Sequence, residues 1–157
     1  MGLMNMASGA SLWRGYEYYQ SKKVQAIEQI DETQFHGSVA GSRGNIYDVF
    51  INTAHPRKSL CNCPHANGRR IICKHMIALY FTSFPQEAEE YYKKVIAYEE
   101  EQEQLAEETQ DRLIQCIKGM RKAQLQEILI QLLENGPAWQ YDEFVDTYVD
   151  WEDDDEE

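Results

Sequence analysis

Long apolar runs are absent from this 157-residue sequence, and basic residues are scarce in its second half. No run approaches the roughly 20 apolar residues needed to cross a bilayer, so we expect no membrane partner. No basic region followed by an apolar stretch opens the sequence, so a secretory signal is not expected and a cytoplasmic location is the default. With 43% hydrophobic residues the chain can still build a core, which argues against wholesale disorder.

The sequence also lacks the common motifs of catalysis. It contains no phosphate-binding glycine loop, no nucleophile elbow and no helix with paired histidines. The glycines within 41–44 are typical of a hairpin turn. Acidic clusters occur at 99–103 and 150–157, but nothing in the sequence arranges them as a general acid and a general base. We therefore expect neither an enzyme nor a small-molecule substrate.

Charge is distributed unevenly along the chain. The net charge is −12, yet residues 1–80 hold nine Lys and Arg against five Asp and Glu, a balance of +4. Residues 81–157 hold six against twenty-two, a balance of −16. Attraction for nucleic acid would therefore have to come from the N-terminal half, and the C-terminal half would oppose it.

The first half of the chain is predicted to combine a helix with short strands. Apolar residues at helical spacing predict a helix over 8–22, capped by Ser8 or Ser11. From residue 24 to residue 51 the apolar residues alternate with polar or small ones, which predicts strands. A hairpin loop at 41–44 joins two of these strands. This half is therefore expected to be α+β, with a small antiparallel β meander.

The second half is predicted to be helical. The apolar segment 76–81 suits a buried helix that ends near Pro85, and another helix follows that proline. The remaining predicted elements are an exposed helix or helical linker over 98–111, apolar-striped helices over 109–119 and 121–134, and a short last helix holding Phe144, Val145 and Tyr148.

Three of the four cysteines lie close together and near histidine. Residues i and i+2 of an extended segment project to the same side, so Cys61 and Cys63 can bind one ion. A returning strand over 69–72 would bring Cys73 to the same place, and His75 would lie in the first turn of the following helix. Zinc takes four such donors in a tetrahedron. The spacing therefore predicts one structural zinc ion held by Cys61, Cys63, Cys73 and His75.

Three alternatives stay open at this point. The clustered cysteines could be buried free thiols beside a surface histidine. His65 competes as a ligand, although its place after Pro64 suggests a solvated loop residue. Cys116 lies beside Ile114 and Ile117 on a striped helix, where a buried thiol is the simplest interpretation.

The pattern Cys-x-Cys-Pro, followed by Cys-Lys-His at the start of an apolar helix, resembles the SWIM zinc finger. The resemblance is specific over about 46–82 and plausible from about residue 11. It implies that Cys61, Cys63, Cys73 and His75 are the ligands in a ββα-like finger. We thus divide the chain into a SWIM-type zinc-binding domain at 8–84, a helical extension at 86–149 and an acidic disordered tail at 150–157. No ATPase or transposase domain accompanies the finger, so the activities of larger family members do not transfer.

One functional hypothesis is a protein-interaction module, in which a small adaptor or regulatory protein presents its C-terminal helices to a partner. The −16 balance of residues 81–157 and the leucine stripe at 125–133 favour it. Ordinary core packing is the simpler interpretation of that stripe.

The alternative hypothesis is nucleic-acid (DNA) binding by the finger. Five basic residues surround the predicted ligands and could form one patch, and SWIM fingers are suggested to bind DNA or protein. A solvated basic face that offsets the thiolate charge explains the same residues more simply. The candidate nucleic-acid contacts are Arg57, Lys58, Arg69, Arg70 and Lys74.

Overall fold

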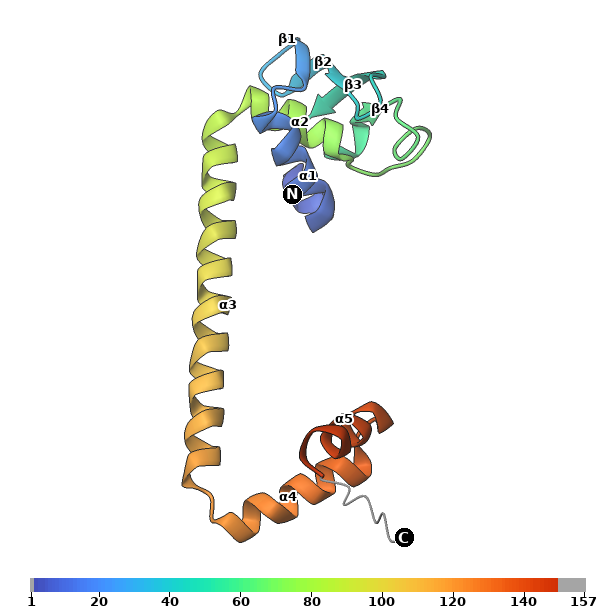
Figure 1. Cartoon of the computed structure of the whole chain (residues 1–157). Coiled ribbons are helices and arrows are strands. Elements are labelled where there is room, and N and C mark those ends of the chain that lie inside the picture. Colours follow the sequence, from blue (N-terminus) through green and yellow to red (C-terminus); the bar gives the residue numbers. More distant parts are fainter. Residues whose placement is uncertain (1, 150–157) are drawn as a thin grey trace, which may run out of the picture. The chain divides into compact units, whose positions relative to one another are not determined.

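The computed structural model describes residues 2–149, and the chain divides into two compact units (Figure 1). The first unit runs to Tyr98 and the second begins at Glu99. This boundary falls inside helix α3, which spans Pro85–Gly119. The predicted acidic tail at 150–157 lies outside the described residues. None of the described helices is both long enough and apolar enough to span a membrane.

The first unit contains the predicted antiparallel meander. The sheet has the order β1-β2-β3-β4, and every neighbouring pair is antiparallel. Phe35, Gly37 and Val39 alternate as buried residues along β2, as the sequence pattern predicted. Gly44, with φ +79°, forms the hairpin turn between the second and third strands. The four strands are β1 (Val24–Gln29), β2 (Gln34–Ala40), β3 (Ile46–Asn52) and β4 (Leu60–Cys61).

Two helices complete this unit, and their packing gives it three layers. Helix α1 (Gly9–Gln20) begins at Ser8, whose Oγ accepts a hydrogen bond from the Ser11 amide. Helix α2 (Lys74–Ser83) packs against the sheet on one side and against α1 on the other. Because α2 is covered on both sides, its sequence is apolar nearly all round. The side chains of Met76, Ile77, Leu79 and Phe81 within α2 are fully buried.

The second unit is helical, and here one prediction from the sequence was wrong. Separate helices had been expected after Pro85 and over 109–119, but Pro85–Gly119 is one continuous helix. The stretch between residues 98 and 111 contains no glycine or proline. It is rich in Glu and Gln and also holds Leu105 and Ala106, all of which favour helix, so nothing interrupts α3. Two shorter helices follow, α4 (Lys122–Asn135) and α5 (Ala138–Tyr148).

The helices of the second unit bury very little. No side chain within residues 99–149 falls in the buried class. Cys116, predicted to be a buried thiol, is exposed on α3. The prediction failed because an apolar stripe buries a cysteine only where another element covers that stripe, and nothing covers this one within the described residues.

Candidate metal centre

The predicted ligands come from the end of a strand and the start of a helix. Cys61 is the last residue of β4, and Cys63 follows two residues later. Cys73 is the N-cap of α2, and His75 lies in the first turn of that helix. All four side chains are buried, with exposed fractions between 1% and 5%. Their ligand atoms all lie within 4.8 Å of one another.

The distances within this cluster match a zinc site. The Nδ1 atom of His75 lies 3.8 Å from Sγ of Cys61 and 3.9 Å from Sγ of Cys73. Tetrahedral zinc with bonds of 2.0–2.3 Å holds neighbouring ligand atoms roughly 3.5–3.8 Å apart. The four donors therefore fit one structural zinc ion, with Nδ1 as the nitrogen of His75 that faces it.

The ionisation of the thiols shows why the cluster suits a cation. The pKa of Cys61 is raised because its thiol donates a hydrogen bond to Cys73, and burial raises it further. The pKa of Cys73 is lowered to about 4 because its sulfur accepts hydrogen bonds, first from Cys61 and then from His75. Burial and the charge of Cys73 raise the pKa of Cys63. The protein alone thus favours one thiolate, whereas a divalent cation would stabilise three.

Backbone amides already point at the sulfur atoms. The amide of Cys63 donates to the sulfur of Cys61, and the amides of His65 and Ala66 donate to Cys63. The amide of Met76, in the first turn of α2, helps to lower the pKa of Cys73. These donors stabilise thiolates and hold the side chains in place before any metal binds.

The loop between the two ligand pairs differs from the prediction. A returning strand over 69–72 had been expected, but the loop is made of turns, closed by amides of Ala66 and Asn67 that donate to the carbonyl of Cys63. Gly68 has φ +69°, which ends any extended run there. Only Ile72 pairs, as an isolated parallel bridge with Ala7. The N-terminal segment, not a second finger strand, therefore positions the chain before Cys73.

The histidines of this region have different environments. His65 is exposed and lies outside the cluster of four donors. The ring of His75 is packed by Tyr47, with centroids 4.5 Å apart, and by Tyr18 at 5.5 Å. Its Nε2 atom is buried without a hydrogen-bond partner in the described structure.

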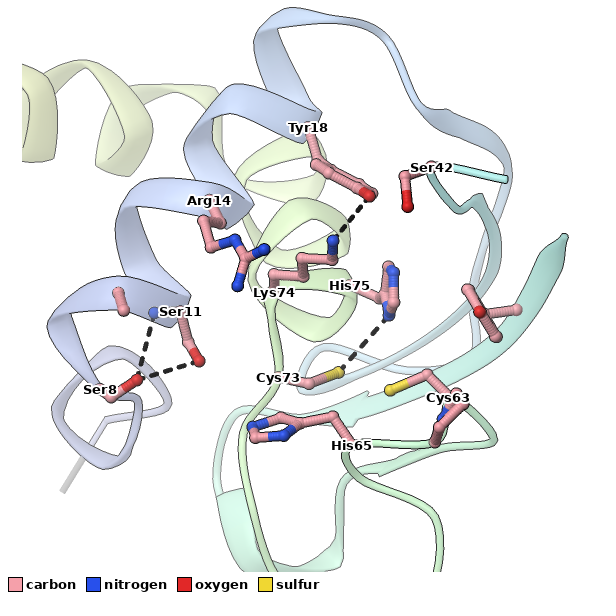
Figure 2. A pocket seen from close by; sticks show the side chains of 13 residues that line it. Ser8, Ser11, Arg14, Tyr18, Ser42, Cys63, His65, Cys73, Lys74 and His75 are labelled. Carbon is pink, nitrogen blue, oxygen red and sulfur yellow. Dashed lines mark hydrogen bonds between the residues drawn. The ribbon is translucent and has the colours of Figure 1, made fainter. Parts of the chain in front are cut away.

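The five predicted basic residues do not share one environment. Arg57, Lys58, Arg69 and Arg70 are exposed. Lys74 is half-buried, and its Nζ donates to the hydroxyl of Tyr18 at 2.7 Å and lies 4.3 Å from the centroid of that ring (Figure 2).

The sequence analysis missed two residues of α1 that lie at this centre. Arg14 and Tyr18 line a pocket beside it together with Lys74. More than fifty residues separate α1 from α2, so no local pattern links them. The only signal available was that Arg14 and Tyr18, four residues apart, share one face of the predicted helix.

The comparisons with known proteins agree with this geometry. Residues 47–83 match the family model of the SWIM zinc finger. Neither a curated protein nor a solved structure matches the chain. The matched residues run from β3 through all four metal donors to the end of α2.

Proposed function

Because residues 47–83 are a SWIM zinc finger, we propose that the chain is a zinc-stabilised protein-interaction module, a small adaptor or regulatory protein. Apolar side chains exposed on the helices of the second unit are the observation that supports this proposal. The finger would stabilise the first unit, and α4 and α5 would present the binding surface.

The exposed apolar residues are numerous for helices of this size. On α4 the exposed fractions are 39% for Ile128, 43% for Leu129 and 61% for Leu132. On α5 they are 61% for Trp139 and 54% for Tyr141. Extended apolar surfaces of this kind mark protein–protein contacts, and aromatic residues are enriched at them. The leucine stripe is therefore better explained by a partner than by the core of this chain.

The charge of the same unit indicates what kind of partner would bind. Residues 99–149 contain twelve Asp and Glu against four Lys and Arg. An acidic surface attracts a basic partner and speeds its association. We therefore propose a protein partner whose docking face is apolar at its centre and basic at its rim.

The metal centre supports a structural role over a catalytic one. A catalytic zinc keeps a position open for water, usually with three protein ligands. Cys61, Cys63, Cys73 and His75 supply four donors, all buried. A closed shell of this kind stabilises a fold and leaves no position for a reacting group.

Replacing Leu132 by aspartate is expected to abolish partner binding. The change places a charge at the most exposed aliphatic position of the leucine stripe, where a partner would desolvate it at a cost equivalent to tenfold or more in affinity. The measurement is affinity capture with the wild-type chain, followed by titration of the purified captured protein against both forms.

Ile30→Asp is the matched control, because Ile30 is 55% exposed but lies in the first unit. Equal affinity of the wild type, L132D and I30D would contradict the proposal. A wild-type chain that sediments as a dimer, with L132D monomeric, would also contradict it and assign the surface to a second copy.

Nucleic-acid binding is the second candidate, and the exposure of Arg57, Lys58, Arg69 and Arg70 favours it. None of the four forms an ion pair within residues 2–149. We expect zinc-loaded protein to bind duplex DNA in a salt-dependent manner if these residues contact phosphates. The double variant R69Q/R70Q would then reduce the slope of log K against log salt by about 1.8.

The control for that titration is R121Q/K122Q, which removes two positive charges from the second unit. Binding that is absent at low salt, or that falls equally in both double variants, would reject the finger as a nucleic-acid site.

A further inference from the structure

A pocket of about 380 Å³ lies beside the metal centre. Its wall is built from the first turns of α1 and α2, the hairpin loop at 41–44 and the loop that follows Cys63 (Figure 2). The volume falls within the range of small-ligand sites. Cys63, Cys73 and His75 also line it, so the pocket adjoins the zinc site and extends from it toward α1 and the hairpin loop.

The charges that line the pocket have one sign. Arg14 and Lys74 contribute two cations, and no Asp or Glu is among the lining residues. A zinc ion with three thiolates and one imidazole carries a charge of roughly −1, so the two cations exceed it. Arg14 forms no ion pair within residues 2–149, which leaves its guanidinium free for a ligand.

Hydrogen-bond donors surround these cations. The hydroxyls of Ser8, Ser11 and Ser42 line the pocket, and Figure 2 shows Arg14 and Lys74 between them. In the first turn of α1, the Ser11 amide donates to Oγ of Ser8, whose hydroxyl donates to Oγ of Ser11. Cations and hydroxyls together are donors that proteins use to bind phosphate oxygens.

The ring of His75 forms part of the pocket wall. His75 is 4% exposed and lines the pocket, and its Nε2 has no partner among the described residues. A metal on Nδ1 would leave the proton on Nε2, which makes that nitrogen a donor. Figure 2 shows this nitrogen on the side of the ring away from Cys73 and toward Ser42. The rings of Tyr47 and Tyr18 pack on the imidazole and leave Nε2 fully buried, so an oxygen in the pocket does not reach this nitrogen. The contacts of a ligand come instead from Arg14, Lys74 and the serine hydroxyls.

We propose that this pocket binds a phosphate monoester. A terminal phosphate offers three free oxygens and enters a pocket from one side, whereas a diester inside a strand needs an open groove on both sides. Its charge of about −1.5 to −2 at neutral pH is opposite in sign to the net charge of about +1 that Arg14, Lys74 and the zinc shell give the pocket. The source is either a free nucleotide or the 5′-phosphate end of a nucleic-acid strand. This site is independent of the docking surface on α4, so either can fail without the other.

The test uses zinc-loaded full-length chain and three probes in calorimetric titrations. The probes are adenosine 5′-monophosphate and one single-stranded oligonucleotide with either a 5′-phosphate or a 5′-hydroxyl. We expect binding of a phosphorylated probe and at least tenfold weaker binding of the 5′-hydroxyl strand. Arg14→Gln is expected to weaken binding of the phosphorylated probe about tenfold, because it removes a charge-assisted hydrogen bond. Binding of the mononucleotide alone would identify a free nucleotide as the source, and binding of the 5′-phosphate strand alone would identify a strand end.

Lys122→Gln is the control, because Lys122 is exposed, lies in the second unit and does not line the pocket. The zinc content of each variant is measured on the same sample, so that loss of metal is not mistaken for loss of a contact. Measurable binding of the 5′-phosphate and 5′-hydroxyl strands with equal affinity, equal weakening by R14Q and K122Q, or no binding of either phosphorylated probe would overturn the proposal.

Discussion

Replacing Cys73 by serine is expected to release the zinc ion and unfold the first unit. Structural zinc contributes about 10–16 kcal/mol of apparent binding free energy in small zinc-finger peptides. Whole domains have a net stability of only about 5–15 kcal/mol, so losing most of the metal's contribution removes the folded state. Cys73 is 1% exposed and caps the buried helix α2, so the damage would spread to the core. The measurements are zinc per chain by mass spectrometry and thermal unfolding followed by circular dichroism.

Cys116→Ser provides the matched control for this experiment. It makes the same chemical change at an exposed thiol on α3, far along the chain from the four donors. We expect one zinc ion per chain and a melting temperature within about 2 °C of the wild type, as for most surface substitutions. A C73S protein that retains full zinc content and an unchanged transition would show that the cluster does not hold the metal.

Replacing Gly15 by alanine is expected to destabilise the first unit by about 1–3 kcal/mol. Gly15 is buried where α1 crosses α2, and an added methyl group would overlap the side chain of Ile77 and approach the carbonyl oxygen of Lys74. The two helices would have to separate, although α2 is packed against the sheet on its other side. Thermal unfolding of zinc-loaded protein measures the effect, expected at about 4–8 °C for each kcal/mol.

Gly9→Ala is the control within the same helix. Gly9 opens α1 and is exposed, and an added methyl group there meets no atom within 4 Å. Alanine favours helix over glycine by up to about 1 kcal/mol, so this variant should match or exceed the wild type in stability. If G15A were as stable as G9A, the close approach of α1 and α2 would not be required for the fold.

The local elements of the first unit could be read from the sequence because each carries its own physical signal. Alternation of apolar residues located β2, and a serine ahead of an apolar periodicity located the start of α1. The metal centre was predictable for the same reason, since the donor spacings of i and i+2 fix which side chains can meet. These signals depend on neighbouring residues alone, and the fold preserves them.

Other features had no local signal. Arg14 and Lys74 line one pocket because of the way α1 packs across α2. The strand expected over 69–72 is absent, and Ile72 instead forms an isolated bridge with Ala7. The prediction that Cys116 is buried was wrong, because an apolar stripe on a helix does not show whether another element covers it. Each of these outcomes depends on a segment that is distant in sequence.

The sequence by itself determined the four zinc donors, the meander and the apolar helix behind them. Short-range geometry and the chemistry of thiolates and imidazole are sufficient for that result. Only the tertiary structure decided that two helix ends and the metal loop enclose a cationic pocket, and that the stripe on α4 stays exposed. The physical reason is that a pocket and an uncovered surface are properties of packing between distant elements, which no single stretch of residues encodes.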